Sequence, residues 1–443
     1  MTGYELNLRK YTDLVDSIHL SKDSGKVTEV TGMMVKGFLP GASVGSICRI
    51  TPTGTEKHFL AEVVGFKDQS VLMMPLHEMR GVGLGSRITL VQQSALVRVS
   101  DALLGRVVNG LGQTIDGGEP IEFSREVPLY SEVRNPLERR PIRQSLDLGV
   151  RAINAALTIG QGQRIGIMAG SGVGKSVLMG MMARNSKADV NVIALIGERG
   201  REVREFIEND LGAEGMARSV VVCVTSDQSP LLRMRGAFVA TAMAEYFSAQ
   251  GKNVLLMMDS ATRFAMAQRE IGLSAGEPPA SKGYTPSVFA TLPKLLERAG
   301  SFEGEGSITG LYTVLVEGDD MDDPIGDSVR SIVDGHIVLS RKLAHKAHFP
   351  SIDVLQSASR VMSAVAGKDH IKLAQKLREA LAVYRDAEDL INIGAYKPGA
   401  NPKIDKSVKV IDQLNAFLKQ GVDEKTDMTK TLRELQGILV NFN

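Results

Sequence analysis

A glycine-rich stretch near the middle of the chain has the residue types of a phosphate-binding loop. It reads AGSGVGKS from Ala169 to Ser176, follows the apolar segment RIGIM and precedes the helix-forming segment VLMGMMAR. A strand, a glycine loop and a helix in this order allow backbone N–H groups and a helix N-terminus to face nucleotide phosphates. The sequence therefore predicts a P-loop. Its nucleotide-binding residues would be Ala169, Gly170, Ser171, Gly172, Val173, Gly174, Lys175, Ser176 and Val177.

Two side chains of this loop have a defined chemistry. Lys175 can reach the β and γ phosphates of ATP, and the Ser176 hydroxyl can bind Mg²⁺, a hard cation that prefers oxygen ligands. Ala169 replaces the first glycine of the usual motif, and a small residue still fits that turn. The simpler alternative, a glycine-rich turn that only connects a strand to a helix, is disfavoured because motif and context agree.

Two carboxylates follow apolar segments further along the chain. Asp259 ends the segment VLLMMD, which is typical of the acidic residue near the metal of P-loop ATPases, where it would bind Mg²⁺ through a water molecule. Glu198 follows NVIALIG, where a carboxylate could polarise the attacking water. Each has a plainer explanation, since strands often end in Asp for turn chemistry and Glu198 opens a charged stretch. The upstream P-loop favours the catalytic interpretation of both.

The segments that would position these residues change character along the chain. Short runs rich in Val, Ile and Thr between Gly and Pro turns predict a small β-barrel over residues 25–94. Residues 95–361 alternate apolar strands with longer helical segments, which predicts a P-loop ATPase domain with a parallel sheet and helices on both faces. Residues 362–443 carry apolar residues at helical spacing, which predicts a C-terminal helical domain. The expected fold is therefore a multi-domain α/β protein.

The first 24 residues form a segment of their own, residues 1–24. An apolar stripe at helical spacing predicts an amphipathic helix within it, formed by Tyr11, Leu14, Val15 and Ile18. The stripe could contact a partner protein, and packing on its own chain is an equally good interpretation.

Composition limits the class of protein. A chain of 443 residues with 43% hydrophobic and 23% charged residues can bury a sizeable core and exceeds the usual size of one domain. Lys and Arg number 52 against 51 Asp and Glu, so we expect no nucleic-acid partner. Cys48 and Cys223 lack the spacing of a disulfide framework or a zinc site. The opening MTGYELNLRK is no signal peptide, and the apolar runs are too short to span a membrane, which predicts a cytoplasmic protein.

Several long segments, in order, resemble the ATPases related to the catalytic subunit of rotary ATP synthase, and among them the bacterial flagellar type III export ATPases. The match covers nearly the whole chain. The segments that carry it are LLGRVVNGLGQTIDGG, RRPIRQSLDLGVRAINAALTIGQGQRIGI, AGSGVGKS, GER, DSATRFAMAQREIGL, EPPASKGYTPSVFATLPKLLERAG and PSIDVLQSASR. The resemblance implies a RecA-like central domain.

The same resemblance implies roles for individual residues. Glu198 resembles the water-activating glutamate, with Arg199 beside it near the γ-phosphate, and Arg263 resembles another arginine of the nucleotide site. Phe349 is similar to the aromatic residue that stacks on adenine, although ordinary core packing would also explain it. Arg360 resembles the arginine finger that one subunit inserts into the site of the next, with a surface ion pair as the plainer alternative.

The resemblance also implies an assembly and a set of partners. Because one chain carries both the glutamate and the finger, a ring of identical subunits with a site at every interface follows. The resemblance implies that this ring is a homohexamer. The implied partners are a regulatory, stator-like export protein at residues 1–24, export-gate and stalk proteins, and exported proteins with their chaperones. The implied location is peripheral, at the cytoplasmic face of the inner membrane.

The functional prediction is ATP hydrolysis that energises the unfolding and export of flagellar proteins through a type III secretion apparatus. The order Asp-Ser before Val329 resembles the flagellar ATPases. A virulence-type injectisome ATPase is the main alternative, followed by a catalytic subunit of ATP synthase and an RNA-translocating hexamer. A neutral charge balance and the lack of an obvious RNA-binding aromatic motif argue against the last of these.

Overall fold

The computed structural model describes residues 24–131, 134–316 and 323–442. Contacts divide the chain between Ala95 and Leu96 into two compact units. The predicted amphipathic stripe, from Tyr11 to Ile18, lies outside the described residues.

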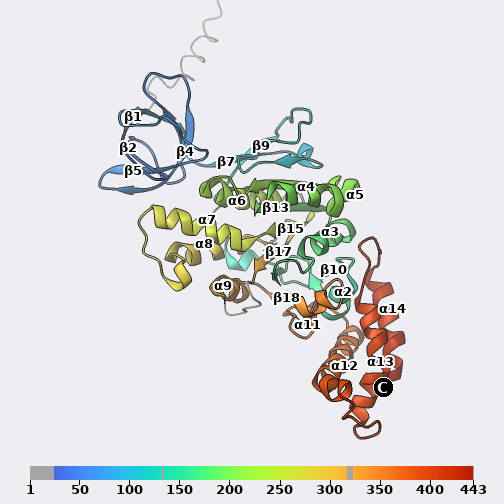
Figure 1. The fold of residues 1–443 in the computed structure, drawn as a ribbon. Helices are drawn as coiled ribbons and strands as arrows, with labels where there is room; N and C mark the ends of the chain where they lie inside the picture. The colour runs from blue at the N-terminus through green and yellow to red at the C-terminus, as the bar shows by residue number, and fades with distance from the viewer. Residues whose placement is uncertain (1–23, 132–133, 317–322, 443) are drawn as a thin grey trace, which may run out of the picture. The chain divides into compact units, whose positions relative to one another are not determined.

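The first unit is a closed six-stranded barrel in the order β1-β2-β5-β4-β3-β6, with antiparallel pairing throughout (Figure 1). Its strands are β1 (Ser24–Thr31), β2 (Met34–Phe38), β3 (Ile47–Thr51), β4 (Phe59–Lys67), β5 (Ser70–Pro75) and β6 (Arg87–Gln92). Alternate side chains, among them Val35, Ile50, Val63, Met73 and Ile88, fill the interior. Closure leaves no unpaired edge, and the predicted barrel is confirmed.

The second unit is built on a nine-stranded sheet in the order β19-β18-β12-β17-β15-β13-β14-β8, with β16 paired to β17. The central strands are parallel. The strands are β8 (Val107–Val108), β12 (Arg164–Ala169), β13 (Val190–Glu198), β14 (Ser219–Thr225), β15 (Asn253–Asp259), β16 (Gly300–Ser301), β17 (Ser307–Leu315), β18 (Gly335–Leu339) and β19 (Ala358–Ser359). Two small ribbons accompany it, β7 (Leu96–Val99) with β9 (Arg125–Pro128), and β10 (Ser145–Leu146) with β11 (Ile159–Gly160).

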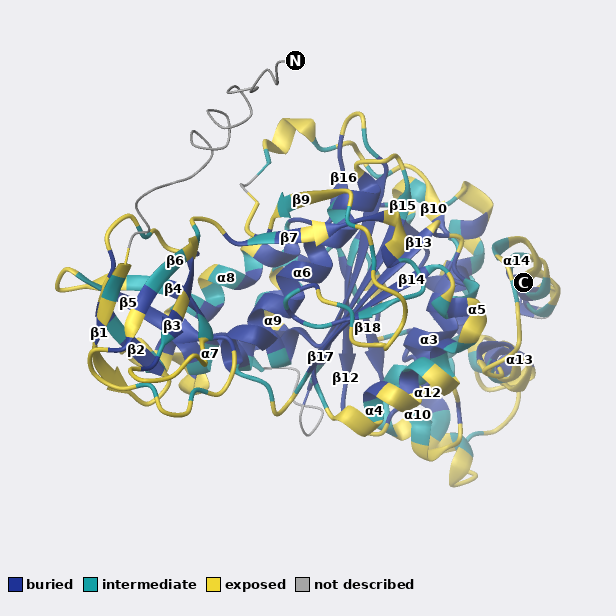
Figure 2. Cartoon of the chain, turned by 90° about the horizontal axis from the view of Figure 1, so that it is seen from above, coloured by how far each residue is buried: buried dark blue, intermediate teal, exposed yellow. Residues whose placement is uncertain are grey.

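Helices cover both faces of this sheet, as predicted (Figure 2). On one face lie α6 (Pro230–Ser248), α7 (Ala261–Ser274) and α9 (Pro324–Ile332). On the other face, side chains of α2 (Arg151–Ala156), α3 (Lys175–Asn185) and the π-helix η3 (Phe206–Leu211) join one apolar cluster with alternate strand residues. The other α-helices before α12 are α4 (Gly200–Glu205), α5 (Gly212–Met216), α8 (Pro286–Leu296), α10 (Arg341–His345) and α11 (Met362–Val365).

The C-terminal part consists of three helices, α12 (Lys368–Asn392), α13 (Pro402–Leu418) and α14 (Met428–Leu439). Their apolar faces belong to the same buried cluster as α2 and the sheet. Arg151 of α2 fastens them further, because its Nε donates to the Phe417 carbonyl over 2.7 Å and its guanidinium pairs with Glu424. The helices therefore pack as part of the second compact unit.

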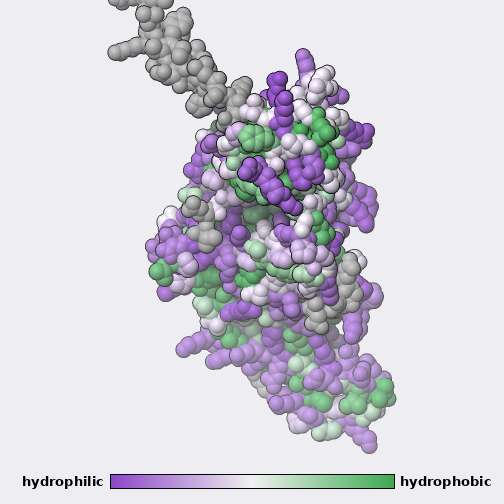
Figure 3. Space-filling model, turned by 90° about the vertical axis from the view of Figure 1, so that its left-hand side faces the viewer, coloured by the Kyte–Doolittle hydropathy of each residue, from purple (hydrophilic) through white to green (hydrophobic). Residues whose placement is uncertain are grey.

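The surface and the thiols agree with a folded, multi-domain chain. The face seen in Figure 3 is mostly hydrophilic, with small scattered apolar groups of the kind ordinary for folded proteins. Cys48 and Cys223 are both free and buried. Within the described ranges, every helix is too short or too polar to cross a membrane.

Leu414 offers a test of the C-terminal packing, because its side chain is fully buried while Val408 of the same helix is 39% exposed. We expect Leu414→Ala to lower the free energy of unfolding by about 2–5 kcal/mol, from lost burial and the cavity left behind. Urea unfolding at 25 °C measures the change, and Val408→Ala is the matched control. Equal effects of the two substitutions would contradict the described packing.

Candidate functional site

The predicted phosphate-binding loop connects β12 to α3. Gly172 and Gly174 adopt positive φ angles of 74° and 89°, a backbone region that favours glycine. Gly174 directly precedes the first residue of α3, so the unpaired N–H groups of that helix open toward the loop. Ala169 is buried in the core, and its carbonyl accepts from Val316 N over 3.0 Å. The departure from glycine at this position is therefore accommodated by packing.

Three charged side chains meet beside the loop. Because β12, β13 and β15 are parallel members of one sheet, their carboxyl ends reach the same edge, where Glu198 and Asp259 end their strands. Lys175 Nζ lies 2.5 Å from Asp259 Oδ1 and 3.7 Å from Glu198 Oε1. Thr313 Oγ1 of β17 donates to the same Asp259 oxygen over 2.7 Å. The structure thus brings together three of the residues predicted for catalysis and metal binding.

This grouping changes the protonation of two of its members. Burial alone would lower the pKa of Lys175, but the carboxylates of Asp259 and Glu198 outweigh it and raise the pKa. The pKa of Glu198 is raised to about 7, mainly by burial and next by the Asp259 carboxylate, while Lys175 acts in the opposite direction. Glu202, one turn along the chain, also raises the pKa of Glu198 through a hydrogen bond. Glu198 can therefore gain or lose a proton near neutral pH, as a general base must.

The two predicted arginines near Glu198 lie in different surroundings. The Arg263 side chain passes over Gly197, so close that a Cβ on that glycine would lie 3.0 Å from Arg263 Cβ. Its charge is also near enough to oppose the raised pKa of Lys175. Arg199, in contrast, has a side chain 76% exposed and pairs with Glu202 over 3.2 Å. The structure places Arg263 at the site and turns Arg199 toward solvent.

Phe349 lies against the end of the loop that leads into α3. The ring approaches Gly174 so closely that a Cβ there would be 3.5 Å from Phe349 Cδ1, and the residue is 45% exposed. The next segment is fixed to the loop, because Ser351 Oγ donates to the Val173 carbonyl over 2.7 Å. A half-exposed aromatic face beside a phosphate loop is available to stack on a base.

Arg360 lies at the opposite edge of the sheet. It follows β19, which runs antiparallel to β18, and its N–H donates to the Asp334 carbonyl over 2.9 Å. In the register of the sheet, Asp334 lies opposite Arg164, the first residue of β12. The P-loop follows the last residue of the same strand. At about 3.3 Å per residue the two ends of β12 are roughly 17 Å apart. Arg360 is therefore not brought to the P-loop of its own chain.

The residues beside the P-loop fit a magnesium ion. Among the described residues no group of three or more His, Cys, Asp or Glu side chains could hold a metal by itself. Mg²⁺ in nucleotide sites needs few protein ligands, because phosphate oxygens and waters supply the rest. Ser176 at the second position of α3 and Asp259 at the end of β15 offer one hydroxyl and one carboxylate. Such oxygen donors suit a hard cation.

The sequence did not single out three residues that the structure adds to this site. Thr313 binds Asp259, Glu202 contacts Glu198, and Ser351 fixes the loop. Glu202 follows Glu198 by four residues, but Glu198 ends a strand and Glu202 lies on α4, so helical spacing does not connect the two. Thr313 carries no motif, and Ser351 lies in the segment PSIDVLQSASR, which by itself gives no sign of a bond to the P-loop.

Family models match most of the second unit. The nucleotide-binding domain model of the ATP synthase alpha/beta family matches residues 149–359. The model of the T3SS EscN ATPase C-terminal domain matches residues 366–437. The first match includes the P-loop, both carboxylates and the end of β19.

Individual relatives match along nearly the whole chain. A Flagellum-specific ATP synthase of Bacillus subtilis (strain 168) is 51% identical, over 98% of this chain and 99% of the relative. A Type 3 secretion system ATPase of Xanthomonas euvesicatoria is 49% identical, over 94% of this chain and 93% of the relative. The structure of the assembled ATPase EscN in complex with its central stalk EscO, from enteropathogenic E. coli, has a TM-score of 0.87 at 44% identity, covering 94% of this chain and 100% of that one. These similarities confirm the resemblance seen in the sequence.

Lys175→Ala tests the phosphate-binding loop. We expect ATP hydrolysis to fall about 10²–10³-fold, because the cation that would neutralise the phosphates is removed from a partly buried site. The fold should remain, since Asp259 keeps its bond from Thr313. Hydrolysis and thermal melting are measured together, with exposed Lys187, just beyond α3, replaced by Ala as control. Near-normal hydrolysis by Lys175→Ala would contradict the assignment.

Proposed function

Because the chain belongs to the family of the flagellum-specific ATP synthases and type 3 secretion system ATPases, we propose that it works as a ring of six identical subunits that hydrolyse ATP at their interfaces. The observation that carries this proposal is the separation of Arg360 from the P-loop of its own chain. Lys175, Glu198 and Asp259 gather at one edge of the sheet, and Arg360 lies at the other.

Within one subunit the side chains divide the work on ATP. Lys175 leaves Asp259 for the β and γ phosphates, and Phe349 stacks on the adenine ring. Ser176 and Asp259 would hold Mg²⁺, and the cation would supply neutralisation of the phosphate charge. Glu198 accepts a proton from the attacking water, and Arg263 lies close enough to stabilise the developing negative charge. We leave Arg199 without a direct catalytic role, since its side chain pairs with Glu202 in solvent.

The finger completes the site from the neighbouring subunit. One arginine side chain does not span the roughly 17 Å between the ends of β12. A head-to-tail contact, by contrast, places the Arg360 edge of one subunit against the P-loop edge of the next, and repetition of that contact closes a ring. A guanidinium that enters in this way neutralises charge in the transition state.

The ring would work within a protein-export apparatus. The assembled EscN relative binds a central stalk, EscO, and we propose a stalk protein in the corresponding place for this chain. We further propose export-gate proteins, exported proteins with their chaperones, and a regulatory, stator-like protein at residues 1–24 as partners. Together these would hold the ring at the cytoplasmic face of the inner membrane, where ATP hydrolysis energises unfolding and export.

Flagellar export is the preferred system, and injectisome secretion is the second candidate. The flagellar and secretion relatives differ little in identity, 51% against 49%, so overall similarity fits both. The Asp-Ser order before Val329 favours the flagellar system. A fluorescent fusion expressed in its own cells separates them: foci at flagellar bases are expected, and foci at injectisomes with normal flagella after gene deletion would favour the alternative.

Glu198 provides a pH test of the base. Since its pKa is raised to about 7 and only the ionised carboxylate accepts a proton, kcat/KM for ATP should rise with pH through about 7 and be lost below. Phosphate groups titrate in the same range, so Glu202→Gln is the comparison. It removes one cause of the raised pKa of Glu198 and should move the rise in kcat/KM to lower pH.

Glu198→Gln tests the carboxylate directly. This variant should bind ATP but hydrolyse it at least about 100-fold more slowly. Parent-like turnover by this variant would assign the water to another residue.

Mixed rings test the shared site. An Arg360→Ala subunit retains its own P-loop and Glu198, while a Glu198→Gln subunit retains its finger. Each uniform ring should be nearly inactive, because a finger contributes about 10³–10⁵ in rate. Mixtures should recover activity, since some interfaces combine an intact Glu198 with an intact Arg360. Hydrolysis is measured across mixing ratios with subunit exchange verified by fluorescence. Verified mixed rings without recovery would rule out action in trans.

A further inference from the structure

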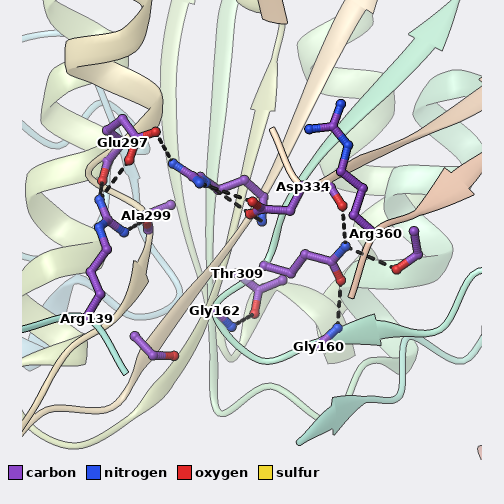
Figure 4. Close-up of polar contacts among 12 residues, drawn as sticks. Arg139, Gly160, Gly162, Glu297, Ala299, Thr309, Asp334 and Arg360 are labelled. Carbon is purple, nitrogen blue, oxygen red and sulfur yellow. Dashed lines mark hydrogen bonds and ion pairs between the residues drawn. The ribbon is translucent and has the colours of Figure 1, made fainter. Parts of the chain in front are cut away.

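A buried glutamine holds the chain beside Arg360. Gln163 is completely buried at the start of β12. Its Oε1 accepts from Gly160 N over 2.8 Å, and its Nε2 donates to the Asp334 carbonyl over 3.0 Å and to Ser359 Oγ over 3.2 Å. The Asp334 carbonyl is also the acceptor of the Arg360 N–H. One amide group therefore contacts both backbone segments that meet at Arg360 (Figure 4).

Asp334 is itself held in place by a chain of charges. Its carboxylate receives hydrogen bonds of 3.1 Å from the backbone N, Nε and a terminal nitrogen of Arg164. Arg164 pairs on its other side with Glu297, which pairs with Arg139 over 3.0 Å. Arg139 also donates to the Ala299 carbonyl over 3.0 Å. Bidentate and charge-assisted contacts of this kind fix geometry well.

The finger needs such support because little else fixes it. β19 has only two residues, and Arg360 lies directly beyond it. Its guanidinium donates to the Arg330 carbonyl in the last turn of α9 over 3.2 Å, and Figure 4 shows the side chain leading away from the polar contacts around Asp334. A charged group that must meet phosphate oxygens precisely loses rate when its backbone shifts by about 1 Å.

We propose that Gln163, together with Ser359, is a positioning residue that sets the backbone of Arg360 for catalysis in the neighbouring subunit. The inference rests on the proposed interface site and adds to it two residues that hold the backbone of Arg360 in place. Gln163 directly precedes β12, and the P-loop follows the other end of that strand. In the proposed ring, one strand would therefore connect the support of the finger given to one neighbour with the phosphate loop that receives the finger of the other.

The test uses Gln163→Met, which keeps length and removes all three side-chain hydrogen bonds. We expect uniform rings to lose about 10–100-fold in kcat with KM for ATP little changed, since ground-state binding stays intact. Ser359→Ala is the second variant; it removes the contacts of Gln163 and of the Thr158 carbonyl at a partly exposed position. It should act in the same direction even if Gln163→Met folds poorly.

Mixed rings separate positioning from general damage. A Gln163→Met subunit has a sound site and a poor finger, so mixing with Glu198→Gln subunits, which offer good fingers, should restore activity. Mixing with Arg360→Ala subunits should not, because the only fingers present are poor ones. The opposite pattern, recovery with Arg360→Ala alone, would mean that the substitution damages its own site and would overturn the proposal. Recovery with neither, or no loss of kcat in uniform rings of either variant, would also overturn it.

Two controls complete the design. Thr309→Val removes a buried hydrogen bond at the same end of the sheet, from Gly162 N over 2.9 Å, without touching Ser359 or Arg360, and should leave kcat near the parent value (Figure 4). The pair Glu198→Gln with Arg360→Ala tests the interface site itself. If that pair recovers and the Gln163→Met mixtures do not, the inference alone fails. If that pair does not recover, the interface site fails and the inference with it.

Discussion

Parallel strand pairing in the large sheet, with β12 between β17 and β18, fixes where the P-loop, the two carboxylates and the backbone of Arg360 lie. Hydrogen bonds set the register, so Gly166 of β12 lies opposite Tyr312 on one side and His336 on the other. Parallel strands share a direction, and all their carboxyl ends therefore meet at one edge. The P-loop and the two carboxylates lie at that edge. The support of Arg360 follows from the other, where the same three strands begin.

Charge balance at the carboxyl edge explains how the site can exist before nucleotide arrives. A lysine buried among apolar strands would be costly alone, and two carboxylates compensate it. Two carboxylates around one cation leave an excess of negative charge, and the proton of Glu198 relieves it, since its pKa is raised to about 7. Under the proposed function, the phosphates and the cation would rearrange these charges when they enter. The proton on Glu198 and the contacts of Lys175 are thus coupled to substrate binding.

Much of the fold and part of the site could be predicted from the sequence. Apolar runs located β12, β13, β14 and β15, and the loop motif located Lys175. The sheet order could not be predicted, because β17 lies between β12 and β15 although it follows both in the chain. Pattern rules describe neighbours along the chain, and sheet order is decided by which apolar faces pack together. Residues whose partners come from that order therefore carried no signal.

Thr313 and Gln163 illustrate this limit. Thr313 becomes a partner of Asp259 only because β17 lies beside β15, and Gln163 reaches Asp334 only because β18 lies beside β12. The packing of the C-terminal helices is a similar case, since periodicity predicted the helices but gave no sign of Arg151 bonding to them. The distance between Lys175 and Arg360 likewise depends on topology. A motif can identify a residue such as Arg360, but the topology of the sheet determines whether that residue lies near the P-loop of its own chain.

The separation of Arg360 from the P-loop has a genetic consequence. With the proposed interface site, a cell with one normal and one variant copy of the gene would build rings from both products. A subunit without Arg360 would then silence a site whose remaining residues all come from the normal copy. Such an allele would be dominant, because variant subunits that fold, assemble and bind ATP would inactivate the ATP sites of neighbouring normal subunits. In a monomeric enzyme the same substitution would be recessive, because each normal chain would keep an intact site.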